Sequence, residues 1–304
     1  MRKRLFPILC LILTLGFASV SAAELVRAVR SKISAGDLAS ATALVEDYKK
    51  KTGVDPEYLD AVGWLARAAE MLNKLDVAAA HVAELRREIP QERPELLSPL
   101  GAAIEVEGKL LAVREGRGSA VRFLETEFAH ATDLGLRTRI RKNINLLSLE
   151  GQPAPELNIA NFVGSEPSRL AALKGKPVLL FLWAHWCGDC KAQAASLSRV
   201  LQKYRSRGLT IIAPTRFYGT AATEKPASPD EEKQHMQKVW SEFYGGLEGV
   251  SAPIDTETMV RYGVSATPTF VLIDRKGLVR FYSPTRLSEA ELSRRIEAVL
   301  EEPL

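Results

Sequence analysis

A change of hydrophobic periodicity near Gly151 constrains the fold of this 304-residue chain more than any other feature. Before it, segments such as 36–51 and 75–89 repeat apolar residues with the 3.6-residue period of a helix, and strand-like alternation is absent. Beyond it, short continuous apolar runs alternate with amphipathic segments. The sequence therefore predicts an all-α domain over residues 24–150, followed by an α/β domain over residues 151–304.

One part of the helical region carries a recognisable repeat. The segment YLDAVGWLARAAEMLNKLDVAAAHVAEL, residues 58–85, resembles a tetratricopeptide unit, with an aromatic residue near its start and small residues where the two helices cross. We therefore expect an α-solenoid-like helical domain. Stacked repeats build an extended concave surface, so this domain is either a docking surface for a partner protein or a structural extension.

The first 23 residues have the pattern of a secretory signal peptide. Three basic residues precede an apolar run over residues 5–17, and a stretch of mostly small residues follows at 19–23. An uncleaved membrane anchor is the alternative, although the run is shorter than the roughly 20 residues that span a bilayer. Cleavage would remove Cys10 and predicts an exported, periplasmic or extracytoplasmic protein that no longer contacts the membrane. Disulfides persist in that compartment.

The charge of the chain gives little indication of a partner. The formal net charge is +4, and loss of the three basic residues in 1–23 leaves +1, because no acidic residue precedes Glu24. No basic stripe interleaved with aromatic residues is present, so we expect no nucleic-acid partner.

The C-terminal region reads as alternating strands and helices. The apolar run 177–184 predicts a strand buried on both faces, 197–208 predicts an amphipathic helix, and 209–213 predicts a second buried strand. Such a unit implies parallel pairing through a right-handed crossover. Further along, a capping box predicts a helix start at Ser228, and residues 264–282 predict a hairpin.

The segment WAHWCGDCKAQ, residues 183–193, holds Cys187 and Cys190. A c-type haem attachment needs a histidine after the second cysteine, where Lys191 stands. A structural zinc site needs four ligands, and no second cysteine pair exists. The four histidines are scattered over the chain: His81, His130, His185 and His235. A disulfide that closes two residues stabilises a fold little. Redox chemistry without a metal or cofactor remains, since the pair follows a buried strand and begins a helix.

The two cysteines are expected to have different roles. Free N–H groups and the dipole at a helix N-terminus favour an anion, which lowers the pKa of Cys187 and makes it the nucleophile. Cys190 lies one turn into the helix and suits the resolving role, in which it attacks the mixed disulfide and releases the product.

The segments GQPAPELN, LKGKPVLLFLWAHWCGDCK and YGVSATPTFVLIDRKGLV together resemble the TlpA-like thiol–disulfide oxidoreductases, exported members of the thioredoxin superfamily, over about residues 151–303. The resemblance implies a mixed sheet flanked by helices. It implies that Pro268 is cis, that Thr267 presents its backbone to a bound substrate chain beside Cys187, and that Trp186 shields the site. It also implies protein thiols and disulfides as substrates, and an upstream thiol protein as electron donor or acceptor.

Two departures from that family concern proton transfer. Phe181 stands where many thioredoxins carry a buried aspartate, and Gln193 stands where some TlpA-like proteins place a glutamate. With neither acid present, water or another group must assist Cys190.

Three further residues are expected to tune the pair. Gly188 and Asp189 replace the more usual residue-plus-proline between the cysteines, and the charge of Asp189 should raise the pKa of Cys187. A protonated His185 would lower the pKa of Cys187. The alternative is that His185 is a solvated histidine at a position where the family accepts different residues.

The sequence thus predicts an exported thiol–disulfide oxidoreductase. The alternative is a non-catalytic adaptor that binds a partner through the helical domain and keeps a weak or vestigial redox pair. A peroxidase of the peroxiredoxin type is a weaker interpretation, because no threonine precedes Cys187 at the spacing that activates a peroxidatic cysteine. Whether the protein reduces or oxidises its substrates depends on its reduction potential and partners.

Overall fold

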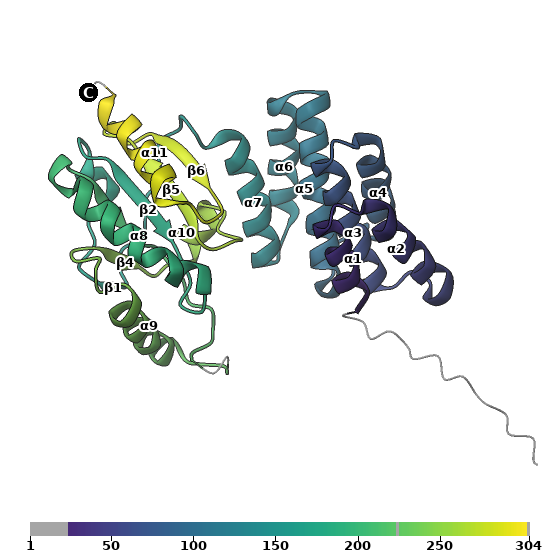
Figure 1. Cartoon of the computed structure of the whole chain (residues 1–304), viewed down its shortest axis with the longest axis horizontal. Helices are drawn as coiled ribbons and strands as arrows, with labels where there is room; N and C mark the ends of the chain where they lie inside the picture. The colour runs from purple at the N-terminus through teal and green to yellow at the C-terminus, as the bar shows by residue number, and fades with distance from the viewer. Residues whose placement is uncertain (1–23, 223–224, 303–304) are drawn as a thin grey trace, which may run out of the picture.

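The computed structural model describes residues 24–222 and 225–302. The predicted signal peptide, residues 1–23, lies outside this range. An all-helical half precedes a half built on a mixed sheet with helices on both faces, which is the predicted fold class (Figure 1).

The N-terminal half consists of helices joined by short connections, which place consecutive helices antiparallel. They are α1 (Glu24–Ser34), α2 (Leu38–Thr52), α3 (Pro56–Met71), α4 (Leu75–Glu88), the 3₁₀ turn η1 (Pro94–Leu96), α5 (Leu97–Arg114), α6 (Arg117–His130) and α7 (Leu134–Ser148). Aspartates begin several of them: Asp55 caps α3 and Asp133 caps α7, each accepting a backbone N–H at 2.8 Å.

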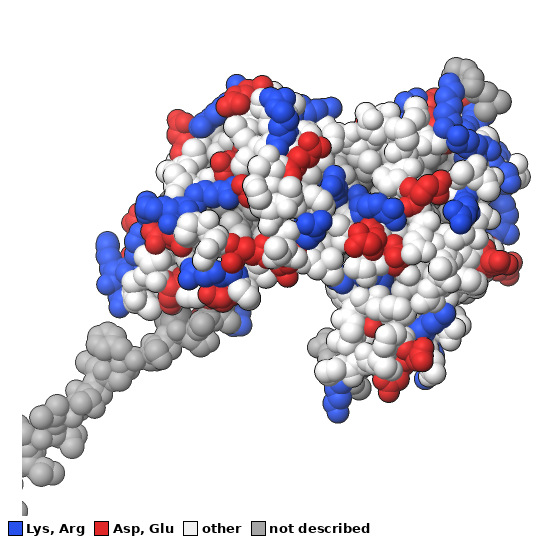
Figure 2. Space-filling model, turned by 180° about the vertical axis from the view of Figure 1, so that it is seen from behind, with Lys and Arg blue, Asp and Glu red and all other residues white. Residues whose placement is uncertain are grey.

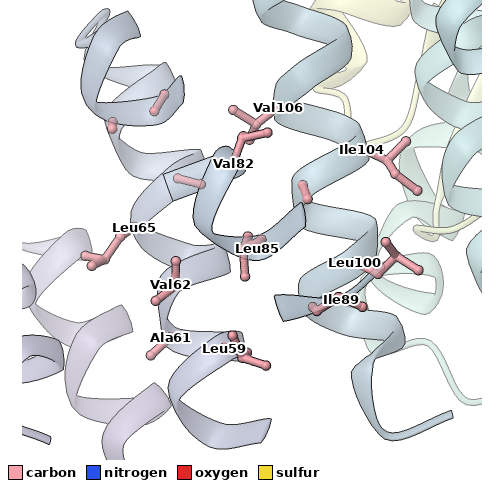
Figure 3. Close-up of a cluster of buried hydrophobic side chains, with 14 of the residues drawn as sticks. Leu59, Ala61, Val62, Leu65, Val82, Leu85, Ile89, Leu100, Ile104 and Val106 are labelled. Atoms are coloured by element: carbon pink, nitrogen blue, oxygen red, sulfur yellow. The ribbon is translucent and has the colours of Figure 1, made fainter. Parts of the chain in front are cut away.

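Small residues bring α3, α4 and α5 close together around one core. Leu59 and Leu65 of α3, Leu85 of α4 and Ile104 of α5 are buried in it (Figure 3). A β-carbon on Gly63 would lie 3.0 Å from that of Ala102, so the glycine permits the close approach of α3 and α5.

The sheet of the C-terminal half has the order β1-β4-β3-β2-β5-β6. Its strands are β1 (Phe162–Gly164), β2 (Val178–Leu182), β3 (Thr210–Ile212), β4 (Ser251–Pro253), β5 (Thr269–Ile273) and β6 (Val279–Ser283). Strands β2, β3 and β4 are parallel neighbours, whereas β1, β5 and β6 pair antiparallel to theirs. The predicted strand–helix–strand unit is confirmed, with α8 (Gly188–Tyr204) connecting β2 to β3.

Helices cover both faces of this sheet. The remaining helical elements are η2 (Leu170–Leu173), η3 (Arg205–Arg207), α9 (Pro229–Phe243), α10 (Thr256–Arg261) and α11 (Glu289–Glu301). Leu179 and Phe181 of β2 pack on the face that α8, α9 and α11 cover, while Leu180 packs on the opposite face with Met259 of α10. The central strand is therefore buried on both sides, which explains its continuous apolar sequence.

The two halves meet where α7 packs against α10 and the loop that follows it (Figure 1). Gly263 has a φ of 63°, and a β-carbon there would lie 2.5 Å from Cα of Lys142 in α7. The side-chain amide of Asn145 in α7 donates to the carbonyl of Arg261 at 3.1 Å. Close backbone packing at Gly263 and this side-chain hydrogen bond therefore hold the helical half against the sheet half.

Candidate active site

The cysteine pair lies where β2 ends and α8 begins. Cys187 is the N-cap of α8, and its Sγ accepts the N–H of Cys190 at 3.1 Å. The two are joined in a disulfide with a Cα–Cα distance of 5.2 Å. Cys187 is 5% exposed and Cys190 is fully buried, so the first sulfur is the more accessible of the two. The helix N-terminus also favours a thiolate there.

A loop from a distant part of the sequence closes on this pair. The peptide bond between Thr267 and Pro268 is cis, as predicted, and directly precedes β5. The carbonyl oxygen of Thr267 lies 3.5 Å from Sγ of Cys187. The fold therefore brings together the cysteine and the Thr-Pro dipeptide, which the sequence separates by 80 residues.

The two tryptophans before the cysteines occupy different environments. Trp183 is fully buried, and its indole N–H donates to the carbonyl of Ala213 at 2.9 Å. Trp186 is 54% exposed and meets the ring of Tyr218 edge-on, with centroids 5.4 Å apart. Trp186 is thus available for contact with a bound chain at the rim of the site.

The residues between the cysteines face solvent. Asp189 forms an ion pair with Arg286 at 3.2 Å, and both side chains are more than half exposed. The carboxylate between the cysteines thus has a partner of opposite charge at the surface, and its influence on Cys187 stays a prediction. A β-carbon on Gly188 would meet open space, so the packing here does not require glycine.

Gln193 is 4% exposed and connects α8 to the segment before α11. Its amide nitrogen donates to the hydroxyl of Ser196 at 2.7 Å and to the carbonyl of Leu287 at 2.8 Å. Its oxygen accepts the N–H of Leu287 at 3.4 Å. The side-chain amide of Gln193 thus pairs with the backbone of Leu287 through both its nitrogen and its oxygen.

The interpretation of His185 as a solvated side chain is wrong, because the residue is only 1% exposed. Its Nε2 lies 3.0 Å from Oε1 of Glu232, a fully buried carboxylate of α9. Burial lowers the pKa of His185, and this outweighs the attraction of the carboxylate for the charged imidazolium.

Glu232 is the functional-site candidate that the sequence analysis missed. Besides the imidazole, it accepts the backbone N–H groups of Tyr218 at 2.6 Å and Gly219 at 2.8 Å, and so ties α9 to the loop after β3. A signal was present in the sequence. Glu232 precedes Met236 by four residues and therefore lies on the apolar face of α9, where a carboxylate needs partners.

The second ring nitrogen of His185, Nδ1, takes no part in the contact with Glu232. If Nε2 of His185 carries the proton that Glu232 accepts, Nδ1 has a free lone pair. Within the described part of the chain, Nδ1 is buried and has no hydrogen-bond partner. The rings of His235 and Tyr218 stand edge-on to it, at 5.1 Å and 5.8 Å between centroids. A buried group able to accept a proton thus lies two residues before the first cysteine.

Among residues 24–222 and 225–302, no three His, Cys, Asp or Glu side chains are grouped so that they would hold a metal ion. In the same ranges, none of the helices combines the length and the apolar character that crossing a membrane requires.

Comparison with known proteins relates the sheet half to a family. Residues 149–296 match the Redoxin family. The thiol-disulfide oxidoreductase ResA of Geobacillus thermodenitrificans is 24% identical over 153 residues, which cover 49% of this chain and 77% of ResA. The thiol:disulfide interchange protein DsbE of Pseudomonas fluorescens is 28% identical over 130 residues, 43% of this chain and 64% of DsbE.

Solved structures align with half of the chain. A putative DsbE from Chlorobium tepidum aligns with 50% of this chain and 97% of its own, at 24% identity and a TM-score of 0.39. A thiol-disulfide isomerase from Corynebacterium glutamicum aligns with 50% and 98%, at 18% identity and a TM-score of 0.43. The C-terminal half of this chain thus contains a Redoxin domain, residues 149–296, and is similar to proteins named thiol-disulfide oxidoreductase and thiol:disulfide interchange protein.

Proposed function

We propose that the protein is an exported thiol–disulfide oxidoreductase that exchanges disulfides with protein substrates through Cys187 and Cys190. The observation that carries the proposal is the position of Cys187, which caps α8 and lies beside the carbonyl of Thr267. In that position the helix N-terminus stabilises a thiolate, and a substrate chain that pairs with the Thr267 backbone brings its own sulfur to Sγ.

The exchange has two balanced steps. The thiolate of Cys187 attacks one sulfur of a substrate disulfide, which forms a mixed disulfide and releases the other substrate sulfur as a thiolate. Cys190 then loses its proton and attacks Sγ of Cys187. This step releases the second substrate thiolate and leaves the pair oxidised, until an upstream thiol protein reduces it. The reverse sequence oxidises a dithiol substrate.

Export is supported by the pattern of residues 1–23. We expect the protein in the periplasm or another extracytoplasmic space, shortened at its N-terminus. Mass spectrometry of the protein from that fraction measures the cleavage site. An intact N-terminus in the membrane fraction would instead support the anchor alternative.

The adaptor alternative loses part of its basis. It rested on the absence of a buried acid at positions 181 and 193, and Glu232 supplies a fully buried carboxylate next to the cysteine loop.

Activity measurements with two cysteine variants test the proposed function. We expect the purified protein to catalyse reduction of insulin by a dithiol, and Cys187→Ser to abolish this activity, because the variant lacks the attacking sulfur. Cys190→Ser lacks the resolving thiol and should accumulate mixed disulfides through Cys187, visible on non-reducing gels.

Equal rates for the wild type and Cys187→Ser would contradict the enzymatic function and favour the adaptor. If the variant with Cys190 alone traps substrates equally well, the two roles are assigned the wrong way round.

A further inference from the structure

A cavity of about 450 Å³ lies between the two halves of the molecule, directly beside the redox site. Trp186, Tyr218 and the loop that ends at Thr267 line one side of it, and the starts of α5 and α7 line the other. Since Thr267 also contacts Cys187, the cavity begins where a substrate sulfur has to arrive.

The helical wall of this cavity is fixed in place. Gly263, four residues before Thr267, packs against the backbone of α7, and Asn145 of α7 hydrogen-bonds the backbone of α10. The helical half therefore packs against the segment that leads to Thr267. These packed contacts, rather than a linker, set the position of the helical half relative to Cys187.

Two arginines give the cavity its charge. The guanidinium of Arg139 in α7 donates to the carbonyl of Ser98 at 3.2 Å, and that of Arg216 lies 4.5 Å from the ring centroid of Tyr218. Neither forms an ion pair with a carboxylate of the described residues. Asp133, the carboxylate that lines the cavity, caps α7 and, together with Glu105 and Asp60, attracts the guanidinium of Arg139. Two half-buried arginines against one carboxylate still leave the lining of the cavity with an excess of positive charge.

We propose that the helical half is the second wall of the substrate groove. The groove receives an extended segment of a protein substrate, and an acidic side chain near the target cysteine of that segment meets Arg139 and Arg216. An extended chain advances about 3.3 Å per residue, so side chains a few positions from the cysteine reach this cavity. This inference rests on the proposed function and deepens it, because it gives the helical half a part in substrate choice.

Charged peptide substrates test the inference on the full chain. Two short peptides carry one cysteine as a 2-thiopyridyl disulfide, flanked by glutamates in one and by lysines in the other. The Cys187 thiolate of the reduced protein attacks the peptide sulfur and releases 2-thiopyridone, whose absorbance gives the rate. The readout is the ratio of the acidic-peptide rate to the basic-peptide rate within each variant, which cancels any general change in activity.

We expect the wild type to favour the acidic peptide, and the preference to weaken with added salt, which screens partly exposed charges. Arg139→Gln and Arg216→Gln should each lower the ratio, by up to about fivefold, as expected for a partly exposed ion pair. Arg122→Gln is the matched control, since Arg122 is exposed on α6 and hydrogen-bonds Ser119, away from the cavity. Its ratio should equal that of the wild type.

A wild-type ratio near one overturns the inference, as does a ratio that both cavity variants leave unchanged or that the control lowers equally. The two arginines stand on separate halves, so either variant carries the test if the other does not fold. Failure of the proposed function has a different signature, namely no release of 2-thiopyridone from either peptide.

Discussion

Glu232 is held by three donors in a place where water does not reach: the imidazole of His185 and two backbone N–H groups. A buried carboxylate is tolerable only when it is paired in this way, because an unpaired one costs several kcal/mol. The pairing fixes the ring of His185 beside the cysteine loop and orients its Nδ1. At the scale of single residues, Glu232 therefore positions the histidine.

The depressed pKa of His185 predicts a pH dependence of stability. Burial lowers the pKa in the folded state, opposed by Glu232 and reinforced by His235 and Lys191, while the unfolded chain titrates near 6.5. As the pH falls below about 6.5, the unfolded state binds a proton that the folded state does not. The free energy of unfolding should therefore fall with pH, by up to about 1.4 kcal/mol per pH unit for one group.

Urea unfolding of His185→Asn between pH 7 and pH 5 checks this expectation. The slope of stability against pH should be smaller than in the wild type, although His81 and His235, whose pKa values burial also lowers, keep part of it. His130→Asn, an exposed position at the end of α6, is the control and should keep the wild-type slope. Identical slopes in all three proteins would show that His185 binds its proton as readily when folded.

At the scale of elements, the link between α8 and α11 depends on one neutral amide. Gln193 donates to the carbonyl of Leu287 and accepts its N–H, a pairing that a carboxylate cannot reproduce because it has no donor. Glutamine at this position therefore has a structural reason. A glutamate would place its charge against the Leu287 carbonyl unless it took up a proton.

Gln193→Glu should accordingly lower the free energy of unfolding by about 1–3 kcal/mol at pH 8, the cost of an unsatisfied buried group. Burial would raise the pKa of the new carboxyl, so the deficit should shrink as the pH falls and be smallest below about pH 4, where the acid is neutral in both states and donates again. Gln202→Glu, exposed on the same helix, should change stability by less than about 0.5 kcal/mol. A deficit that does not vary with pH would mean that the introduced carboxylate turns to solvent.

The elements with strong local signals were predictable, and those set by distant contacts were not. The capping box at Ser228 and the buried runs of β2 and β3 have sequence patterns that act locally, and the structure contains all three. The three-residue strand β1 has no periodicity to reveal it and exists by pairing with β4. Glu232 was missed because its partners, the N–H groups of Tyr218 and Gly219, are identified only by the tertiary fold.

At the scale of the whole molecule, the helical half and the sheet half pack against each other at a defined interface. Each half has its own buried core, and charges of both signs are interspersed over the face shown in Figure 2. Besides the chain itself, the packing of α7 on α10, on β6 and on Gly263 joins the halves. The sequence showed a change of pattern near residue 151, but it contained no sign that Gly263 touches a helix more than a hundred residues earlier.

The substitution Gly263→Ala should therefore disturb the contact between the two halves. Gly263 and Gly277 both have positive φ, 63° and 86°, so an alanine at either is strained by about 1–2 kcal/mol. They differ in surroundings: a β-carbon at 277 meets nothing within 4 Å, whereas one at 263 lies 2.5 Å from Cα of Lys142 and 2.8 Å from the carbonyl carbon of Arg141.

Gly263→Ala should thus lose more stability than Gly277→Ala, and calorimetry should resolve separate transitions for the two halves. Because the groove needs both walls, its preference for the acidic peptide should also fall in Gly263→Ala and persist in Gly277→Ala. Equal losses of stability with an unchanged preference would show that α7 is not the support of the cysteine site that its contacts indicate.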